Sequence, residues 1–564
     1  MNKIYKVIWN TQLGCWQAVS ELAKNHSTAQ SALDTPKSVS GMVQKISGLI
    51  LFGLALLPLS IHAAISNTEL PTGAQINSGS ASFNQNNNTL NINQNSQNLS
   101  THWNTFNIGK DATVNFNQPN QSSTAINHVL DSNAYQIMGR LNANGQVFLL
   151  NPNGVVFSKT AQVNVGGLVA STLTLNDADI QNGKYTLKGG ANSTATIENQ
   201  GAIQTLQGGT VALIAPNVKN TGTITTPNGT THLTSASQVT LALQDGTLTQ
   251  YQVDLGVLQG LVDNSGAIIA DNGAVYLTAK AKDSLSKAVI NHSGIIEANR
   301  LTQNAKGEII LLGDMQFGET IVSGMLKAEG KNGQNGGFIE TSAAHVEIAA
   351  DTKVSTASDT AKSGLWLIDP VDITIDSAKA AAIQTALNSG DVTVTTANSA
   401  ANSWGTNGTA TDKGDIHVNS AINWSTNQAL TLRADNDINI NADITATGAT
   451  GKLNLKYGQS TVNGGTSDYY LQKGAKVNLK AGQNFSTQKG SDGINLKNYQ
   501  VLTELGAQGS TTSQDLQGIN GNLNDNYVLG ADINASTTSG WNSGKGFNTI
   551  GTSRYYFSGV FDGL

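Results

Sequence analysis

Four similar phrases recur in the middle of the chain, and they decide its fold. They are IENQGAIQT (residues 197–205), VKNTGTITT (218–226), LVDNSGAIIA (261–270) and VINHSGIIEA (289–298). Each phrase has a short apolar strand, a turn with Asn and Gly, and a second strand. The phrase glycines, which are Gly201, Gly222, Gly266 and Gly294, lie 21, 44 and 28 residues apart. The interval of 44 is twice 22, with Gly246 between, and that of 28 indicates inserted loops. Periods of about 20 to 50 residues are typical of solenoids.

Apolar and polar residues alternate from residue 65 to about 315, as in Thr113–Asn117 and Gly145–Leu150. This period of two predicts short, half-buried strands. Strands within one rung of a solenoid do not pair with each other, whereas the same strand in successive rungs lies parallel and buries its side chains against its neighbours. We therefore predict an all-β fold, a parallel β-helix. A sandwich or barrel also has short strands, but it does not predict the recurring phrase.

The first 63 residues have the character of an export signal. The apolar run Ile46–Ile61 leads into small residues at the expected cleavage site, Ala63 and Ala64. The run is shorter than the roughly 20 residues of a membrane-spanning helix and is interrupted by Pro58. A cleaved signal is therefore favoured over the alternative, an uncleaved membrane anchor.

An amphipathic extension, MNKIYKVIWNTQLGCWQAVSELAK (residues 1–24), precedes this signal. Its apolar residues could line one face; they are Ile4, Val7, Ile8, Trp16, Val19 and Leu22. The segment closely resembles the extended signal peptide region of very large bacterial exoproteins and autotransporters. The resemblance implies a large exported protein of a Gram-negative bacterium.

The rest of the chain is weakly charged and has no cysteine, because the only one is Cys15. Without residues 1–63 it has 27 basic and 36 acidic residues, a formal charge of −9. Nucleic acid is not expected as a partner, because duplex binding requires a basic patch that neutralises phosphates. No disulfide framework is possible either.

The pattern changes beyond residue 330. Residues 377–388 (SAKAAAIQTALN) predict a helix with Ser377 as N-cap and Gly390 just past its end, covering a strand edge or an end of the core. Strand phrases resume at residues 421–444 and are expected to continue to the C-terminus. The chain ends at Tyr555–Leu564 without a recognisable solenoid cap, so the natural protein is expected to continue.

These boundaries predict four parts. They are an extended signal peptide (1–63, with the extension at 1–24 and the signal proper at 37–63), a secretion domain (64–315), a continuation of the β-helix (316–376) and a further β-repeat passenger region (377–564).

Residues 103–175 resemble the secretion domain of two-partner secretion exoproteins of the filamentous haemagglutinin family. The matching motifs are FNIG (106–109), VNF (114–116), IxGxL (137–141), NGQVFLLNPNGVVF (144–157) and GGLVAST (166–172). Two positions depart from the family pattern. Asn117-Gln118-Pro119-Asn120 stands near the family's NPNL motif, and Val155 replaces the usual Ile after NPNG. These departures leave the secretion subclass, and hence the partner, undetermined. The likeness extends to GGFIETSAAHVEI and WLIDPVDITI, as in high-molecular-weight adhesin-like members.

The resemblance implies a right-handed parallel β-helix. It also implies export by the Sec translocon, cleavage by signal peptidase, and passage through a partner outer-membrane β-barrel whose periplasmic POTRA domains recognise residues 64 to about 310. Outside the cell, the first expectation is a secreted or surface-exposed adhesin that binds a receptor on host or bacterial cells. The stalk of a contact-dependent growth-inhibition toxin and a haem-acquisition or haemolysin-type exoprotein are the alternatives.

Asn151-Pro152-Asn153-Gly154 fits a type I turn, because Asn suits its first position, Pro its second and Gly its fourth. Two interpretations are open. The motif shapes the fold, which is the favoured one, or it contacts the transporter. The same question applies to Asn117 and Pro119.

No catalytic site is expected, although enzymes occur on parallel β-helices. The densest acidic stretches, 369–376 and 433–443, are interpreted as outward polar positions of strands. The histidines lack metal-ligand spacing and are expected at the surface or in turns; they are His102, His128, His232, His292, His345 and His417. Glycine pairs such as Gly208-Gly209 lack the Lys-Ser/Thr ending of a phosphate-binding loop, so no cofactor is implied.

Overall fold

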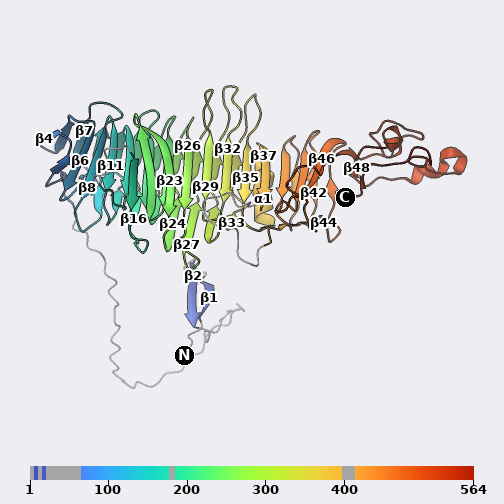
Figure 1. The fold of residues 1–564 in the computed structure, drawn as a ribbon, viewed down its shortest axis with the longest axis horizontal. Helices are drawn as coiled ribbons and strands as arrows, with labels where there is room; N and C mark the ends of the chain where they lie inside the picture. The colour runs from blue at the N-terminus through green and yellow to red at the C-terminus, as the bar shows by residue number, and fades with distance from the viewer. Residues whose placement is uncertain (1–4, 11–14, 21–64, 177–183, 397–412) are drawn as a thin grey trace, which may run out of the picture. The chain divides into compact units, whose positions relative to one another are not determined.

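The computed structural model describes residues 5–10, 15–20, 65–176, 184–396 and 413–564. It has two compact units, Met1–Ala63 and Ala64–Leu564 (Figure 1). In the first unit, β1 (Tyr5–Asn10) and β2 (Cys15–Ser20) pair antiparallel, so the described part of the N-terminal extension is a β-hairpin. The apolar run at 46–61 and the expected cleavage site at Ala63 and Ala64 lie outside the described residues.

The second unit is a parallel β-helix built of three ladders of strands. The long sheet consists of β3 (Gln75–Ser78), β6 (Asn98–Trp103), β8 (Thr124–Val129), β11 (Gln146–Leu150), β14 (Gly167–Ser171), β18 (Thr210–Ala215), β21 (Thr230–Ser235), β26 (Ala274–Ala279), β29 (Glu308–Leu312), β32 (Phe338–Ser342), β35 (Leu365–Asp369), β37 (Asp391–Thr395), β40 (Ala429–Arg433), β43 (Lys452–Tyr457), β46 (Gly482–Lys489), β47 (Leu496–Leu502), β48 (Tyr527–Leu529) and β49 (Phe561–Asp562). The second sheet consists of β4 (Ala81–Asn86), β5 (Thr89–Gln94), β7 (Thr113–Asn117), β10 (Arg140–Ala143), β13 (Gln162–Val165), β17 (Ala202–Thr205), β20 (Thr223–Thr225), β25 (Ala267–Ile269), β28 (Ile295–Glu297), β31 (Met325–Lys327) and β34 (Lys353–Ser355). The third sheet consists of β9 (Tyr135–Ile137), β12 (Val155–Phe157), β16 (Thr196–Asn199), β19 (Asn217–Asn220), β24 (Gln259–Asn264), β27 (Lys287–His292), β30 (Gly318–Val322) and β33 (His345–Ile348).

One rung takes a strand from each sheet in turn, as in β16, β17 and β18, and each strand pairs in parallel with its equivalent in the next rung. The register stacks similar residue types, so that Ile197, Val218, Val262 and Ile290 form one fully buried column. Burying such columns removes apolar surface from water, which is the main stabilising contribution to the core. The predicted parallel β-helix is confirmed, and the sandwich alternative is wrong.

The phrase glycines form a ladder at the corner between the third and second sheets. A Cβ atom on Gly266 would lie 2.2 Å from the carbonyl oxygen of Gly222, and Gly222 and Gly294 are equally close to their own neighbours below. A second glycine ladder, which the sequence phrases did not reveal, precedes the long-sheet strands; there Gly229 and Gly273 each approach the glycine of the preceding rung. Glycine is needed at these corners because the backbones of successive rungs approach closely.

The interpretation of the 44-residue interval as two repeats of 22 residues is wrong. Gly246 is not a rung glycine, because it lies in the turn between β22 (Gln238–Gln244) and β23 (Thr247–Leu255). Strands β19 and β24 pair directly, so the interval of 44 residues is one rung with an inserted hairpin. The interval of 28 is a rung with an inserted loop at residues 280–286, as predicted.

An inserted antiparallel sheet of β15 (Lys184–Lys188), β22 and β23 forms what we call the covering sheet. It packs on the outer face of the long sheet through a second apolar core that includes Phe148 and Tyr185, whose ring centroids are 5.0 Å apart. At the N-terminal end, β3 and β4 pair antiparallel with β6 and β5. Antiparallel strands there interrupt the parallel stacking and cover the first rung.

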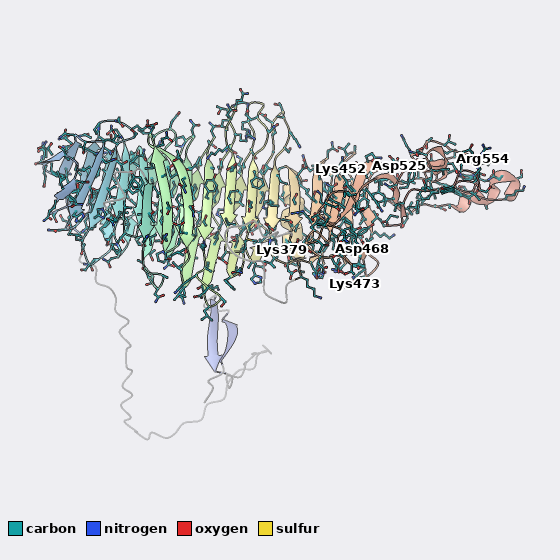
Figure 2. The ribbon with its side chains drawn as sticks, in the orientation of Figure 1. Lys379, Lys452, Asp468, Lys473, Asp525 and Arg554 are labelled. Carbon is teal, nitrogen blue, oxygen red and sulfur yellow. The ribbon has the colours of Figure 1, made fainter. Side chains whose placement is uncertain are left out.

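Helix α1 (Ser377–Ala386) takes the place of a second-sheet strand in its rung and packs against β34 and β39 (Ile422–Trp424). It therefore covers the last strand of the second sheet, as expected. Its N-cap is Asp376 rather than Ser377, because the Asp376 carboxylate accepts the N–H groups of Ala378 and Lys379. The Lys379 ammonium pairs with Glu347 at 2.7 Å. Figure 2 labels Lys379 among the side chains of this unit.

Beyond α1, two shorter ladders accompany the long sheet. They are β36 (Ile373–Ile375), β38 (Ile416–Val418), β41 (Ile438–Ile440) and β44 (Tyr469–Leu471), and β39, β42 (Ile444–Ala446) and β45 (Val477–Asn478). Regular rungs end near β46, which pairs antiparallel with β47. After Leu502 the described chain has two short strands and two 3₁₀ helices, Gln517–Gly521 and Ser536–Gly544. The prediction of strand repeats to the C-terminus was therefore only partly correct.

Candidate functional site

The Asn151–Gly154 motif is a tight turn between β11 and β12. The Gly154 N–H donates to the Asn151 carbonyl at 3.0 Å, and the Asn153 N–H donates to Asn151 Oδ1 at 2.9 Å. Asn153 is not among the residues with positive φ, which a type II turn would require. Gly154 has φ +120°, and a Cβ there would lie 2.7 Å from the Thr196 carbonyl oxygen. The turn thus has type I geometry and requires its glycine.

The side chains of this turn bind the preceding rung. Asn151 is fully buried, and its Nδ2 donates to the Asn133 carbonyl at 2.9 Å. Asn153 Nδ2 donates to the Asp131 carbonyl at 2.8 Å. Pro152 and Asn153 are exposed. One half of the motif therefore holds two rungs together, while the other half faces solvent.

Residues 117–120 occupy a different corner, between β7 and β8. Asn117 and Pro119 are exposed, and Asn117 Nδ2 donates to Asn93 Oδ1 at 2.8 Å. Gln118 is buried and joins neighbouring rungs: its Oε1 accepts the Gly145 N–H at 2.9 Å, and its Nε2 donates to the Ser123 carbonyl at 3.0 Å. Sequence reasoning missed Gln118.

The structure does not bring the two motifs together. Residues 117–120 precede a long-sheet strand, whereas residues 151–154 follow one. Strands β8 and β11 are adjacent and parallel, so the motifs lie at opposite ends of these strands. Five residues of strand separate them by on the order of 17 Å. A single small binding pocket therefore cannot contain both.

A buried polar ladder connects the repeated phrases. Asn199 Nδ2 donates to Asn220 Oδ1 at 2.8 Å, and Asn220 Nδ2 donates to Asn264 Oδ1 at 2.7 Å. Asn264 Nδ2 in turn lies 3.1 Å from Nδ1 of His292, which is fully buried. Burial lowers the pKa of His292 to about 4, so the ring is neutral and accepts this bond while its Nε2 faces the Met325 carbonyl at 3.2 Å. The expectation that the histidines lie at the surface or in turns is wrong for His292 and His232.

His232 lies between two tyrosines. Its ring centroid is 4.0 Å from that of Tyr251 on β23 and 4.8 Å from that of Tyr276 on β26, and both pairs are stacked. Burial, with the Lys306 ammonium nearby, lowers the pKa of His232 to about 3. These rings form part of the wall of a groove of about 800 Å³ between β23 and the outer face of the long sheet.

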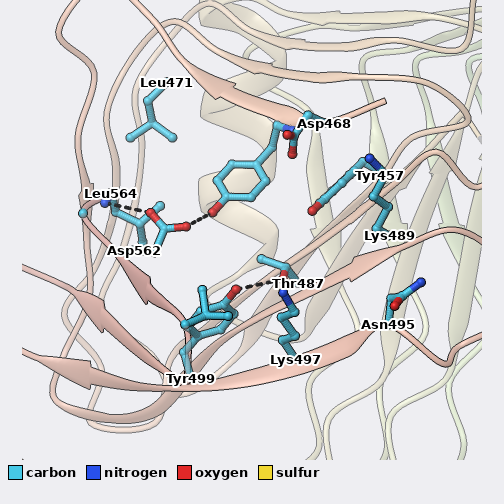
Figure 3. A pocket seen from close by; sticks show the side chains of 13 residues that line it. Tyr457, Asp468, Leu471, Thr487, Lys489, Asn495, Lys497, Tyr499, Asp562 and Leu564 are labelled. Atoms are coloured by element: carbon cyan, nitrogen blue, oxygen red, sulfur yellow. Dashed lines mark hydrogen bonds between the residues drawn. The ribbon is translucent and has the colours of Figure 1, made fainter. Parts of the chain in front are cut away.

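A second cavity, of about 650 Å³, lies near the C-terminal end of the described chain (Figure 3). Its lining includes Tyr457, Tyr469 and Tyr499 together with Lys489 and Asp562. The Tyr469 hydroxyl donates to Asp562, and burial raises the pKa of that tyrosine. The cavity therefore has a polar lining of phenol, carboxylate and ammonium groups.

Parallel pairing brings together residues from the two acidic stretches on the outer face of the long sheet. Asp369 lies one strand away from Thr395, which pairs with Arg433. Burial, with further contributions from Glu340 and Asp435, raises the pKa of Asp369 to about 7, and Arg433 opposes this shift. Asp369 Oδ1 is buried without a hydrogen-bond partner among the described residues.

The raised pKa predicts a pH-dependent stability. Because the folded-state pKa lies above the unfolded value, ionisation of Asp369 lowers the free energy of unfolding as the pH rises from about 4 to about 7, and the loss levels off above that. Asp369→Asn should remove this loss, so the variant should be more stable than the original chain at pH 8 by on the order of 2 kcal/mol and not at pH 4. Denaturant unfolding of both proteins at pH 4, 6 and 8, followed by tryptophan fluorescence, measures this difference in stability. Parallel pH profiles for the two proteins would contradict the prediction.

Within the part of the chain that the structure describes, no cluster of three or more His, Cys, Asp or Glu residues could hold a metal ion. None of the described helices is long and apolar enough to cross a membrane.

Comparison with known families identifies two segments. Residues 67–341 match the model of the TPS secretion domain, and residues 1–49 match the extended signal peptide of the type V secretion system. The fold resembles the crystal structure of the HMW1 secretion domain from Haemophilus influenzae, with a TM-score of 0.51 and 21% identity, over 74% of this chain and 100% of that one. The resemblance to two-partner secretion exoproteins is thereby confirmed.

Curated relatives match parts of this chain. A heme/hemopexin-binding protein of Haemophilus influenzae is 32% identical over 258 residues, which are 44% of this chain and 28% of that protein. The trimeric autotransporter adhesin AtaA of an Acinetobacter species is 36% identical over 126 residues, 22% of this chain and 3% of that protein. The chain thus spans about a quarter of the length of the first of these relatives.

Proposed function

Because residues 67–341 of this chain are a TPS secretion domain and residues 1–49 an extended signal peptide, we propose that a partner TpsB transporter with periplasmic POTRA domains recognises the β-helix. We further propose that the exported protein acts as an adhesin. A protein with these two segments is secreted through the periplasm by the two-partner system, with Sec export as its first step. The family match at residues 67–341 is the observation that carries the proposal.

Physical properties of the chain support passage in an unfolded state. No cysteine follows Cys15, so no disulfide has to be opened before transport. The strands of each rung pair with the corresponding strands of the rung before it. Each rung therefore needs only its predecessor as a template. The antiparallel N-terminal strands supply the first template. Stepwise stacking outside the cell would therefore oppose backward movement.

An adhesive role fits a solenoid whose outer strand faces present a long polar surface. The proposal includes no catalytic role, and its receptor is a molecule on a host or bacterial surface. Haem or haemopexin binding is a second candidate, favoured by the names of two Haemophilus influenzae relatives. Because the alignment covers only 28% of the first relative, it supports a common export route more strongly than a common ligand. Absorbance titration of the secreted chain with haem distinguishes the two.

Deletion of the partner transporter gene tests the export proposal. We expect the protein to disappear from the culture medium and the cell surface and to remain in the periplasm or be degraded there. Restoring the transporter from a plasmid should restore secretion. Secretion that persists without the transporter would refute the proposal.

The NPNG turn allows its two possible roles to be separated. Asn151→Ala removes the buried bonds to Asn133 and Asn153, and should lower the free energy of unfolding by about 1–3 kcal/mol. Pro152→Ala changes an exposed ring, and should leave both stability and secretion close to those of the original chain. Denaturant unfolding and immunoblots of the medium measure these effects. If Pro152→Ala blocks secretion at unchanged stability, the turn is a transporter contact rather than a fold-shaping element.

A further inference from the structure

Strand β23 is an unpaired edge of the covering sheet. The sheet order is β15-β22-β23, and β23 pairs only with β22. Across residues 65–176, 184–396 and 413–564, no strand pairs with its other edge. Such an edge presents a row of N–H and C=O groups that can hydrogen-bond an additional strand. At nine residues, β23 is the longest described strand.

Among the described residues, side-chain hydrogen bonds occupy one end of this edge. The Lys280 ammonium donates to the carbonyl groups of Val253 and Asp254 at 3.3 and 2.9 Å. A lysine in this position is a common means of blocking an edge strand. Residues 248–252 have no such cover, and they line the groove beside β23.

The floor of the groove belongs to the next two rungs and is partly apolar. Tyr276 on β26 pairs with Ile310 on β29, and Thr278 pairs with Leu312. Ile310 and Leu312 are half-buried and line the groove. Equivalent outward residues of earlier rungs, such as Phe148 and Val169, are buried beneath the covering sheet. The same face of the long sheet therefore continues past β23, where no described segment covers Ile310 and Leu312 as the covering sheet covers the earlier rungs.

The edge strand is held firmly in place. Tyr251 of β23 stacks on His232, and its hydroxyl lies 2.6 Å from Thr234 Oγ1. His232 is 6% exposed, and its Nε2 has no hydrogen-bond partner among the described residues. Because these contacts anchor β23 to β21, a strand that binds its edge does not have to order it first.

We propose that this groove binds an extended segment of a partner protein, which adds as a fourth strand beside residues 248–252 of the covering sheet. Alternate apolar side chains of the segment pack on Ile310 and Leu312, and a carboxylate lies opposite the exposed Lys306 ammonium. An extended backbone is the occupant because it continues both the hydrogen-bonded ladder of β22 and β23 and the apolar packing of the covering sheet on the long sheet.

Register-specific cross-linking tests the geometry. In a Cys15→Ser chain, Gln250→Cys places a single thiol on the exposed face of β23. The probes are nine-residue synthetic peptides of alternating Val and Thr with one Glu, each with a cysteine at a different position. We expect disulfide formation to peak at one peptide position and to fall off on both sides of it, because the directly opposite side chain lies within about 5 Å, whereas side chains two positions away lie about 7–8 Å off. Uniform cross-linking along the peptide would refute strand addition.

Binding of the fluorescently labelled peptide tests the roles assigned to the apolar residues of the groove floor and to the Lys306 charge. Ile310→Lys with Leu312→Lys should abolish binding, whereas the matched control Leu365→Lys, a half-buried outward residue two strands further along the long sheet, should not. Lys306→Glu should weaken the Glu peptide roughly tenfold and favour a Lys peptide. Melting temperatures verify that each variant is folded. Folded variants that bind the peptide as tightly as the original chain would overturn the proposal. Gln250→Cys chains that cross-link to each other in preference to the peptide would also overturn it, since the occupant would then be a second copy of this chain.

Discussion

Gly266→Val should disrupt the stacking of rungs in the centre of the β-helix. A Cβ atom at this position would lie 2.2 Å from the Gly222 carbonyl oxygen and 2.8 Å from the backbone carbon of Thr221. Backbone atoms cannot move aside as a flexible side chain would, and the Gly222 carbonyl also accepts the Ala267 N–H at 2.9 Å. The substitution therefore forces two rungs apart, and we expect the free energy of unfolding to fall by more than about 4 kcal/mol.

Hydrogen exchange and thermal unfolding measure this effect. Amide protection should fall first in β24, β25, β27 and β28, which pair around the substituted corner. Gly190→Val is the matched control, because a Cβ there has no heavy atom within 4 Å and its φ is not positive. Its stability should stay within about 0.5 kcal/mol of the original. Equal stability of the two variants would contradict the role assigned to the glycine ladder.

Asn220→Leu should be nearly as damaging, because two buried amide groups lose their hydrogen bonds to Asn220, and Asn199 Nδ2 keeps only a long contact of 3.5 Å to the Thr223 carbonyl. Asn199 Nδ2 would lose its acceptor at 2.8 Å, and Asn264 Oδ1 would lose its donor at 2.7 Å. All three asparagines are fully buried, so water does not replace the lost bonds. Each unsatisfied buried group costs about 1–3 kcal/mol, so we expect a total loss of roughly 3–5 kcal/mol in the free energy of unfolding.

Asn117→Leu provides the matched control. It removes an Asn–Asn bond of 2.8 Å to Asn93, but at an exposed position where water can take its place. Denaturant unfolding should show a loss of less than about 1 kcal/mol for this variant. If Asn220→Leu and Asn117→Leu had the same small effect, the buried ladder would not contribute to stability as its geometry indicates.

Both predictions concern contacts between neighbouring rungs. The same contacts would form one after another if the chain folds rung by rung during export. The buried ladder requires the same register in every rung, since a one-residue slip would place an apolar side chain opposite an amide. Asn220 therefore selects the register in addition to stabilising it. The proposed secretion mechanism depends on this property, because each rung must add correctly to the last one as it emerges.

Several features of the molecule follow from the sequence alone. The period of the Asn-Gly phrases and the alternation within them determine the parallel β-helix, because each rung contacts mainly the rung before it and that contact repeats along the chain. The NPNG turn is equally local, since Asn151, Pro152 and Gly154 set its geometry within four residues. The position of α1 was visible for the same reason, although its cap was misplaced by one residue.

Other features depend on contacts that do not repeat from rung to rung, and only the tertiary structure decided these. In the covering sheet Lys184 pairs with Ala242, which is far away in the sequence. The hairpin of this sheet lengthens one rung to 44 residues, and the sequence spacing was therefore interpreted as two rungs. Outward apolar residues such as Phe148 and Ile310 look alike in sequence, yet the first is covered and the second lies in an open groove. The burial of His232 between two tyrosines likewise results from packing across β21, β23 and β26. The physical reason is that the repeat length and the alternation of apolar residues specify how the strands of one rung pair with those of the next. The contacts of an outward side chain depend instead on where an inserted segment folds back onto the sheet.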